Sequence, residues 1–202
     1  MKPPLSIGQR LHDRYQITRI LGRGGQCLVY LSYDVHQGKD VVIKELLSSD
    51  GSIADEIKEL ELFRGEYRIL SQLDYPSLPK GYDFFVEGSK YFISVEYIEG
   101  QNLEDVIKKS KEPLYEEIVL NWARQLAEVL IYFYNLKPFP LVLRDIKPSN
   151  IIITPQGHIK PVDFTIAKFL KPEEKEDSVK MGSPGYAPRE QYLGRSDTRS
   201  DI

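Results

Sequence analysis

The chain has 202 residues, enough for one large domain or two small lobes. It is 41% hydrophobic and 28% charged, which excludes a disordered chain, and its net charge of −3 leaves no basic footprint for nucleic acid. The single cysteine, Cys27, excludes an internal disulfide and a cysteine-based zinc site. Neither a signal peptide nor an apolar run of about 18 residues occurs, so we expect a cytoplasmic domain without a membrane segment, and an anchor beyond Ile202 stays open.

The first half of the chain is rich in predicted β-strands, with one long helix among them. Alternating apolar and polar residues predict the strands, and apolar residues at three- and four-residue steps predict the helix. A glycine cluster, Gly22-Arg23-Gly24-Gly25, follows the first strand. The predicted elements are strands over Arg14–Leu21, Leu28–Tyr33 and Asp40–Leu46, a helix over Ser52–Leu73, and strands over Tyr82–Val86 and Tyr91–Tyr97.

After Gly100 the pattern becomes mainly helical. Asn102 is a suitable N-cap for a short helix, and a longer helix carries an apolar stripe that we expect to be buried. The stripe comprises Ile118, Trp122, Leu126, Val129, Leu130 and Phe133. The predicted elements are helices over Asn102–Lys109 and Tyr115–Leu136, strands over Ile151–Thr154 and His158–Pro161, and an irregular polar segment over Asp163–Ile202.

Two features of the first half suit a phosphate group. Gly22 and Gly24 lie between strands, where backbone N–H groups without a neighbouring Cβ can approach an anion, although a glycine hairpin without a ligand is the commoner explanation. Lys44 ends an apolar run, where a lysine costs free energy unless it is paired. Glu66, on the apolar side of the following helix, is a suitable partner, while a solvated lysine is the usual alternative.

A second polar cluster surrounds the apolar segment Ile151–Ile153. Asp145, Lys147 and Asn150 precede this segment, and Asp163 follows Asn150 by thirteen positions. A polar turn would explain any one of these residues alone. A base, a cation and two oxygen ligands for a hard metal are together what phosphoryl transfer from a nucleotide requires.

These motifs, in this order, resemble those of eukaryotic-type (Hanks-type) protein Ser/Thr kinases, of the kind also found in bacteria. The motifs are the glycine loop at Leu21–Tyr30, the Val-Ala-Ile-Lys motif at Val41–Lys44, the helix-C glutamate at Glu66, the catalytic loop at Arg144–Asn150, the Asp-Phe-Gly motif at Asp163–Thr165 and the segment Gly182–Glu190. The resemblance implies an α+β, bilobal kinase-like fold, with a β-rich N-lobe that carries helix C and a helical C-lobe.

The resemblance also implies an activity, which is transfer of the γ-phosphate of ATP to a serine or threonine hydroxyl of a protein. Asp145 would accept the hydroxyl proton, Lys147 would neutralise charge on the γ-phosphate, and Lys44, fixed by Glu66, would bind the α- and β-phosphates. Lys147 favours a Ser/Thr kinase over a tyrosine kinase. Together with Gly182–Glu190, it also argues against a small-molecule kinase such as an antibiotic phosphotransferase.

ATP and Mg²⁺ are the cofactors that the resemblance implies. Asn150 and Asp163 would hold the metal ion, and Val95 would be the gatekeeper beside the adenine. The implied nucleotide-binding positions besides Lys44 are Leu21, Gly22, Gly24, Val29, Val42, Glu96, Ile98, Asn102 and Ile152. For Asn102 a helix N-cap is an equally good explanation.

Three further positions concern the loops of the second half. By the resemblance, Arg144 would pair with a phosphate on the activation segment if one is added. Ser178 and Ser183 are candidate phosphate acceptors, and lining the substrate site is the alternative for Ser183. Asp201 matches the aspartate that braces the catalytic loop in the family.

The chain departs from the family pattern at four single residues and one pair. Cys27 replaces the third glycine, Val42 an alanine, Leu143 a histidine, Thr165 a glycine and Pro188-Arg189 an Ala-Pro pair. Thr165 is the most serious, because a β-branched residue disfavours a positive φ. None of these departures removes a group expected to touch phosphate or metal. An active kinase is therefore favoured over the alternative, a nucleotide-binding pseudokinase scaffold.

The expected organisation is an N-terminal extension over 1–13 and a kinase domain over 14–202, with the N-lobe at 14–99 and a partial C-lobe at 100–202. The remainder of the C-lobe would lie beyond Ile202. Apolar partners of Trp122, Leu126 and Leu130 would then be missing, so we expect these 202 residues alone to lack a fully packed C-lobe and full activity. The protein substrate, the activating signal and the oligomeric state are not specified by the sequence.

Overall fold

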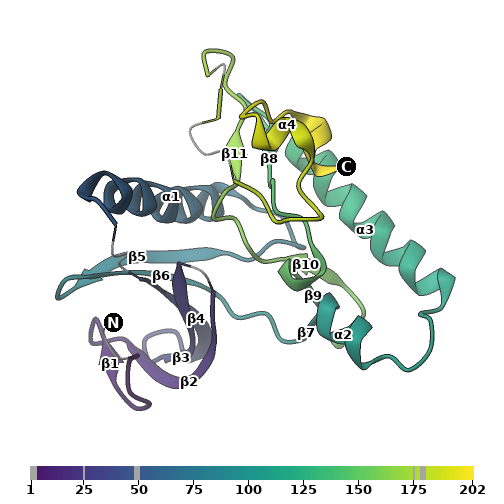
Figure 1. The fold of residues 1–202 in the computed structure, drawn as a ribbon. Helices are drawn as coiled ribbons and strands as arrows, with labels where there is room; N and C mark the ends of the chain where they lie inside the picture. The colour runs from purple at the N-terminus through teal and green to yellow at the C-terminus, as the bar shows by residue number, and fades with distance from the viewer. Residues whose placement is uncertain (1–3, 25, 48–50, 175, 178–180) are drawn as a thin grey trace. The chain divides into compact units, whose positions relative to one another are not determined.

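The computed structural model describes residues 4–24, 26–47, 51–174, 176–177 and 181–202. The chain forms two compact units (Figure 1). The first unit comprises Met1–Asp74 and Pro79–Tyr97, and the second comprises Tyr75–Leu78 and Ile98–Ile202. Among the described residues, no helix is both long and apolar enough to cross a membrane.

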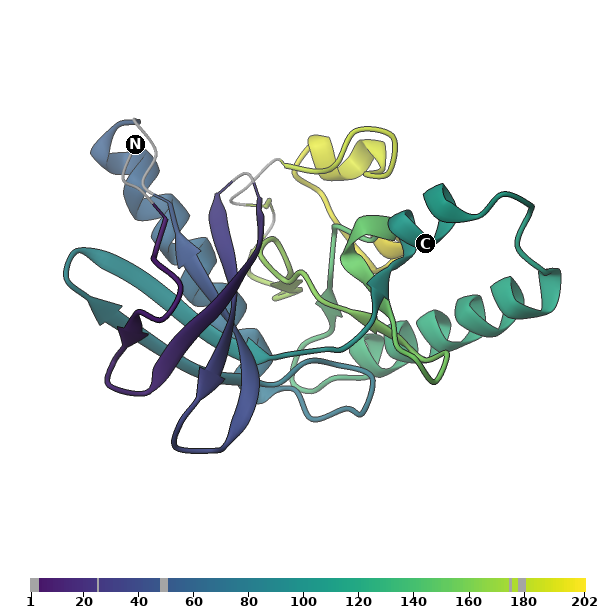
Figure 2. The ribbon, with the colours of Figure 1, turned by 90° about the horizontal axis from the view of Figure 1, so that it is seen from below.

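The first unit is built on an antiparallel sheet of six strands in the order β1-β2-β3-β4-β6-β5. Each strand predicted in this half is present, and its ends lie within two residues of the predicted ones. Two views of the ribbon show that the strands are strongly twisted (Figures 1 and 2). The strands are β1 (Arg10–Leu11), β2 (Tyr15–Arg23), β3 (Cys27–Asp34), β4 (Lys39–Leu46), β5 (Gly81–Glu87) and β6 (Lys90–Glu96).

One face of this sheet covers an aromatic core. The rings of Tyr15 and Phe85 stack with centroids 5.4 Å apart, and those of Phe85 and Phe92 stack at 5.1 Å. The same face buries the carboxylate of Glu45, which accepts a hydrogen bond of 2.7 Å from the hydroxyl of Tyr30. Alternate residues of β3 and β4 point to the opposite face and are half-buried or exposed.

Helix α1 (Ile53–Gln72) packs against β5. Its N-terminus begins with a capping box, in which Ser52 and Asp55 each accept a hydrogen bond from the backbone of the other. A Cβ at Gly81 of β5 would lie 3.0 Å from the Cβ of Leu70, so the glycine permits this close approach. The buried residues of α1 are Phe63, Glu66, Ile69 and Leu70.

Residues 4–13 pack onto the same sheet. Leu5 and Leu11 belong to the hydrophobic core, and the N–H of Leu5 donates to the hydroxyl of Tyr30 at 3.2 Å. Strand β1 pairs with β2. This strand is not predicted from the sequence, because two residues are too few to show an alternation.

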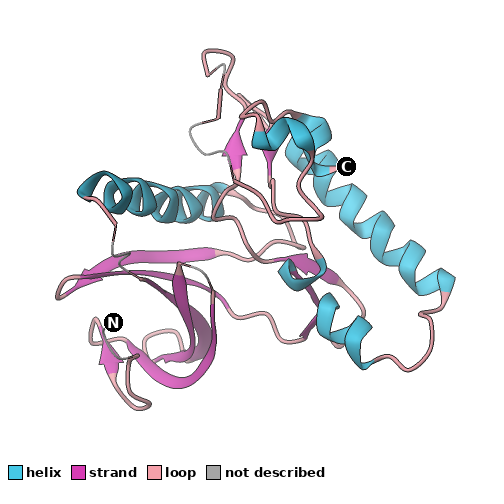
Figure 3. Ribbon diagram, viewed as in Figure 1, coloured by secondary structure: helices cyan, strands magenta, loops and turns pink. Residues whose placement is uncertain are grey.

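The second unit combines helices with short strands and long loops (Figure 3). Strands β7, β9 and β10 form one antiparallel sheet, and β8 pairs with β11. The two predicted helices and the hairpin of β9 and β10 are present, whereas the shorter elements are not predicted. The elements are β7 (Gln101–Asn102), α2 (Leu103–Lys109), α3 (Glu116–Tyr134), β8 (Leu141–Val142), a 3-10 turn (Pro148–Asn150), β9 (Ile151–Ile153), β10 (Ile159–Pro161), β11 (Lys168–Phe169), α4 (Arg189–Tyr192) and a second 3-10 turn (Thr198–Asp201).

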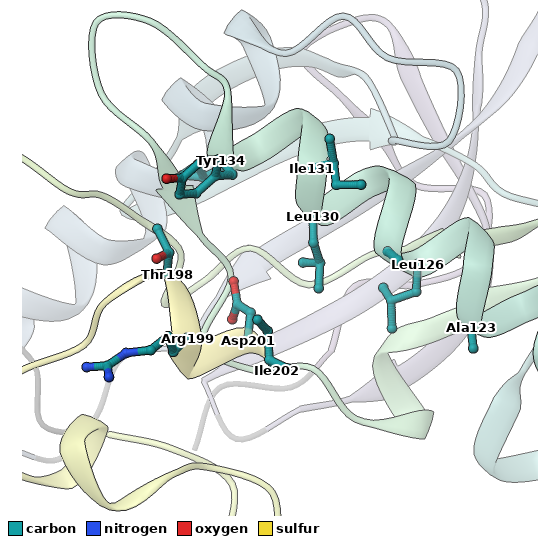
Figure 4. Close-up of a pocket in the computed structure, with 11 residues that line it drawn as sticks. Ala123, Leu126, Leu130, Ile131, Tyr134, Thr198, Arg199, Asp201 and Ile202 are labelled. Atoms are coloured by element: carbon teal, nitrogen blue, oxygen red, sulfur yellow. The ribbon is translucent and has the colours of Figure 1, made fainter.

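Helix α3 buries less of its apolar stripe than the sequence predicts. Of the six residues in the stripe, only Val129 and Phe133 are buried, and the prediction is wrong for the others. Leu126 and Leu130 line an apolar groove of about 630 Å³ beside the second 3-10 turn (Figure 4). Periodicity identifies the apolar face of a helix but not what covers it.

A buried carboxylate fixes the turn between β3 and β4. Asp34 accepts hydrogen bonds from Nε and Nη2 of Arg14 at 2.9 and 2.7 Å. It also accepts from the amides of His36 and Gln37, within the turn, at 2.9 and 3.2 Å. Burial by itself raises the pKa of Asp34, but these hydrogen bonds, led by those from Arg14, outweigh it and hold the pKa below its usual 3.8.

Asp34→Ala should lower the free energy of unfolding by about 3 kcal/mol at neutral pH, because it removes the acceptor of two hydrogen bonds from the half-buried guanidinium of Arg14 and of two from the turn. Since the folded-state pKa is depressed, this contribution is fully present above the ordinary 3.8 and is lost as the pH falls through the folded-state value. Urea unfolding of both proteins at neutral pH and in acid measures the difference. The exposed Asp40→Ala is the control, expected to change stability by less than about 0.5 kcal/mol. An equal loss at both pH values would contradict an ionic origin.

Candidate functional site

Residues from four strands of the first unit form a row across its sheet. Gly22 of β2 is paired with Val29 of β3, Val29 with Lys44 of β4, and Lys44 with Ile93 of β6. Directly paired residues point to the same face, so this row lies on the face opposite the aromatic core. Val42 precedes Lys44 by two residues along β4 and points the same way.

The packing of the first unit requires neither Gly22 nor Gly24 to be glycine. Neither has a φ in the left-handed region, and a Cβ at Gly22 would meet no described atom within 4 Å. At Gly24 the nearest atom would be 3.8 Å away, an ordinary contact. Cys27 also lies outside the left-handed region, so this departure from the family pattern causes no backbone strain, while Gly25 lies outside the described residues. Neither glycine places a Cβ between the backbone and a ligand, although the amide of Gly24 itself donates to the carbonyl of Cys27 at 2.8 Å.

Lys44 forms an ion pair with Glu66 of α1. The carboxylate of Glu66 is almost fully buried, with 1% of the residue exposed. An ion pair with one buried member holds both side chains in one geometry, because separation would leave a charge without compensation. The structure thus brings together the two residues that the sequence predicts as partners.

The remaining predicted nucleotide-binding residues of this unit lie on β2 and β6. Leu21 precedes Gly22 and is 40% exposed. Val95, the predicted gatekeeper, is paired with Val42 across β4 and β6, so the two side chains are neighbours. Glu96 ends β6, and its N–H donates to the carbonyl of Lys80 at 2.8 Å.

In the second unit, three more predicted nucleotide-binding residues lie near its first strands. Ile98 is buried, and Asn102 of β7 is paired with Ile152 of β9. The side-chain oxygen of Asn102 accepts a hydrogen bond of 2.7 Å from the amide of Asp105, at the start of α2. The structure therefore shows the N-cap, and contact of Asn102 with a ribose stays a prediction.

The loop at 143–150 is held by a half-buried aspartate. Asp201 accepts hydrogen bonds from the amides of Leu143 and Arg144, both at 2.7 Å. Burial raises the pKa of Asp201, and the two amides oppose that rise. Arg144 has a φ of 66°, a left-handed conformation that costs a non-glycine residue about 1 kcal/mol or more. The two hydrogen bonds thus stabilise a strained backbone immediately before Asp145.

Asp145 is the centre of a hydrogen-bonded cluster. Its Oδ1 accepts from the hydroxyl of Ser183 at 2.6 Å, and its Oδ2 accepts from Nζ of Lys147 and Nδ2 of Asn150, both at 2.8 Å. Nζ of Lys147 also donates to the hydroxyl of Ser183 at 2.6 Å. Four polar side chains from the loop at 143–150 and from the segment after β11 therefore meet at one place. Three of them are predicted as site residues, and Ser183 is predicted as lining the site or as a phosphate acceptor.

The hairpin of β9 and β10 explains the spacing between Asn150 and Asp163. Ile151 is paired with Pro161, and the N–H of Val162 donates to the carbonyl of Asn150 at 3.0 Å. Asn150 and Asp163 consequently lie at the same end of the hairpin. Their carboxamide and carboxylate oxygens fit a Mg²⁺ ion that also keeps water and phosphate ligands. Among the described residues, no group of three or more His, Cys, Asp or Glu could hold a metal ion by itself.

Thr165, the most serious departure from the family pattern, sits without strain. Its φ is not in the left-handed region, so its branched side chain causes no backbone strain. Its N–H donates to Oδ1 of Asp163 at 3.0 Å. Leu143, in the place of the family's histidine, is 2% exposed and belongs to the apolar interior of the second unit.

The partner of the Arg144 side chain is not predicted from the sequence. Nη1 of Arg144 lies 3.3 Å from Oδ2 of Asp177, where the resemblance implies a phosphate. Ser178, one candidate phosphate acceptor, lies outside the described residues. Nothing in the local pattern distinguishes Asp177 from the other acidic residues of its segment.

Comparison with known proteins agrees with these motifs. The model of the protein kinase domain family matches residues 15–201. The chain is 37% identical over 199 residues to the serine/threonine-protein kinase PrkC of Bacillus subtilis (strain 168), a match that covers 97% of this chain and 30% of that protein. It is 34% identical over 175 residues to the probable serine/threonine-protein kinase YbdM of the same organism, covering 86% of this chain and 65% of that protein. The chain spans less than two thirds of the length of either relative.

A solved structure, the PpkA-294 apo form, shares the fold. It superposes with a TM-score of 0.77 and 21% sequence identity, covering 94% of this chain and 71% of that one. At this identity the likeness concerns the arrangement of helices and strands alone.

Lys44→Met should lower the free energy of unfolding by about 3 kcal/mol, because it leaves the carboxylate of Glu66 buried without its counter-ion. The double variant Lys44→Met/Glu66→Leu should recover part of this loss. Urea unfolding of the four proteins in the double-mutant cycle measures the coupling, which we expect to exceed about 1.5 kcal/mol. The exposed pair of Lys108 and Glu104 on α2 is the matched control, with a coupling below about 0.5 kcal/mol. Equal couplings would contradict a buried ion pair.

Proposed function

Because the chain belongs to the protein kinase domain family, we propose that it is a protein serine/threonine kinase that uses ATP and Mg²⁺. Its α+β fold, with a β-rich unit and a helical unit, is the fold of that family, so the resemblance found from the motifs is confirmed. We propose further that the first unit is the N-lobe and the second unit belongs to the C-lobe. The activity and the protein substrates are proposed as well, because the chain spans less than two thirds of the length of these relatives.

The observation that carries the proposal is the set of hydrogen bonds around Asp145. Its Oδ1 accepts a hydrogen bond from the hydroxyl of Ser183, and the ammonium of Lys147 lies 2.6 Å from that hydroxyl oxygen and 2.8 Å from the other carboxylate oxygen, Oδ2. A carboxylate that orients a hydroxyl beside a cation has the chemistry required for phosphoryl transfer to serine or threonine.

In the proposed reaction, the hydroxyl oxygen of a substrate serine or threonine attacks the γ-phosphorus of ATP. The bond from that phosphorus to the β–γ bridging oxygen breaks, and ADP leaves. Asp145 orients the attacking hydroxyl and accepts its proton. The charge of Lys147 stabilises the negative charge on the transferred phosphoryl group.

The nucleotide is assigned to groups in both units. Lys44, held by Glu66, binds the α- and β-phosphates, and backbone amides near Gly22 and Gly24 approach the phosphates. Val29 and Val42 offer apolar surface to the adenine. Asn150 and Asp163 would hold Mg²⁺, which neutralises phosphate charge when bound. Leu21, Glu96, Ile98, Asn102 and Ile152 complete the proposed set. Since the donor is ATP, we propose a cytoplasmic location.

The departures from the family pattern do not favour a pseudokinase. Cys27 and Thr165 adopt ordinary backbone conformations, and Leu143 is buried in an apolar environment. The side chains of Lys147 and Asn150 are present and donate hydrogen bonds to Asp145. No observation on the described residues supports a scaffold role without catalysis.

Asp145→Asn in the full-length protein should reduce phosphate transfer from γ-labelled ATP to a basic protein by about a hundredfold or more, because an amide cannot accept the hydroxyl proton. The dissociation constant of ATP should change little, since Asp145 is assigned to the hydroxyl of the protein substrate and not to the nucleotide. Asp74→Asn, at a side chain that is 94% exposed, is the matched control and should keep full activity. Transfer that persists in Asp145→Asn would show that the base is wrongly assigned.

Gly22→Ala should weaken ATP binding by about tenfold, since a methyl group keeps phosphate oxygens away from the backbone. Its free energy of unfolding should change by less than about 0.5 kcal/mol, because no described atom lies near the new Cβ. Gly65→Ala is the matched control, in the interior of α1 with nothing near its Cβ. It should stabilise the protein by about 0.5 to 1 kcal/mol without changing ATP affinity. Calorimetric titration and urea unfolding measure both effects, and unchanged ATP affinity in Gly22→Ala would contradict the assignment of the glycine loop.

A further inference from the structure

The segment between β11 and Gly182 contains a buried carboxylate that meets two cations. Asp177 is 7% exposed. Its Oδ2 lies 3.3 Å from Nη1 of Arg144, and its Oδ1 lies 3.1 Å from Nζ of Lys168. Arg144 comes from the loop before Asp145 and Lys168 from β11, so one side chain joins three segments of the second unit.

Further hydrogen bonds complete the surroundings of this carboxylate. The amide and the hydroxyl of Ser196 donate to Oδ2 of Asp177 at 3.0 and 2.6 Å, and the amide of Asp177 donates to the carbonyl of Gly194 at 2.8 Å. Burial alone raises the pKa of Asp177, but these donors, with Lys168 and Arg144, outweigh it and hold the pKa below its usual value. The side chain is therefore a fixed anion in a site that is built around a negative charge.

The two cations that meet Asp177 already have carboxylate partners. Arg144 pairs with Asp177, and Lys168 pairs with Asp177 and with Glu174, which lies 3.1 Å from Lys168 and also pairs with Lys171 at 3.2 Å. A phosphate added to the segment would have to displace carboxylates from the cations that it needs. The guanidinium of Arg144 is also fixed by a hydrogen bond of 2.7 Å from Nε to the carbonyl of Ile166.

Resting on the proposed kinase function, we propose that Asp177 is a positioning residue that takes the place of an activation-segment phosphate. Through Arg144, it holds the loop that carries Asp145 in position. Phosphoryl transfer by this protein then does not require prior phosphorylation of its own activation segment. This role differs from the expectation that Arg144 awaits a phosphate.

The first test needs no variant. The full-length protein is produced together with a protein phosphatase, and mass spectrometry establishes that residues 163–190 carry no phosphate. We expect this protein to transfer phosphate from γ-labelled ATP without a lag, at an initial rate that preincubation with ATP changes by less than about twofold. A rate that is near zero at first and rises as the segment becomes phosphorylated would overturn the proposal.

The second test compares three variants of the unphosphorylated protein. Asp177→Asn should lower kcat by about tenfold or more, because Asp145 would no longer be held in position. The KM for ATP should stay within about twofold, because the nucleotide-binding groups are unchanged. Asp177→Glu retains the negative charge and should recover part of kcat. Glu174→Gln removes a carboxylate from the same lysine without touching Arg144, and it should keep the wild-type kcat.

The outcomes separate this proposal from the proposed function. If wild-type protein, with or without phosphate on its segment, transfers none while Asp145→Asn binds ATP equally well, the kinase function itself fails. If wild-type protein is active and Asp177→Asn has the same kcat at a temperature where circular dichroism shows both folded, the role of Asp177 fails. An equal loss of kcat in Asp177→Asn and Glu174→Gln would also overturn it, because the effect would then follow from total charge.

Discussion

Charged side chains that leave water must meet opposite charges or hydrogen bonds, and this constraint places the functional groups of both units. In the first unit, the buried carboxylate of Glu66 ties Lys44 to α1. In the second unit, Arg144 and Asp177 are buried together. Each pair joins segments that are far apart in the sequence. Moving one of these side chains would separate a buried ion pair. The same contacts therefore fix both the charge and the position of each group.

Backbone hydrogen bonds supply the second level of control. Asp201 holds the amides of Leu143 and Arg144 and makes the left-handed backbone at Arg144 tolerable. The hairpin of β9 and β10 sets Asn150 beside Val162, and hence near Asp163. The separation along the chain between these two residues is thus the length of a hairpin. The hairpin brings the two residues together through regular hydrogen bonds. An irregular loop would have to lose more conformational entropy to hold them in the same place.

Much of this fold is predictable from local patterns, because alternation and helical periodicity depend on nearby residues. The pairing of Lys44 with Glu66 is predictable as well, since each is a charged residue on an apolar face. The burial of Asp177 is not, because it arises from tertiary contacts of a segment without periodicity. The capping of α2 by Asn102 could not be separated in advance from a role with the nucleotide, since both explanations use the same side-chain oxygen. The exposed part of the α3 stripe shows the same limit, because hydrophobicity does not specify a partner.

The turn after β3 determines which charged side chain of β4 lies on each face of the sheet. Asp34 binds the amides of this turn, and Asp34 and Lys39 are the partners that open the pairing of β3 with β4. A slip of β4 by one residue would exchange its two faces. Glu45 would then take the face of Lys44, and an anion would stand where a cation now stands. A hairpin turn that ends six residues before Lys44 therefore decides whether this face of the sheet attracts phosphate or repels it.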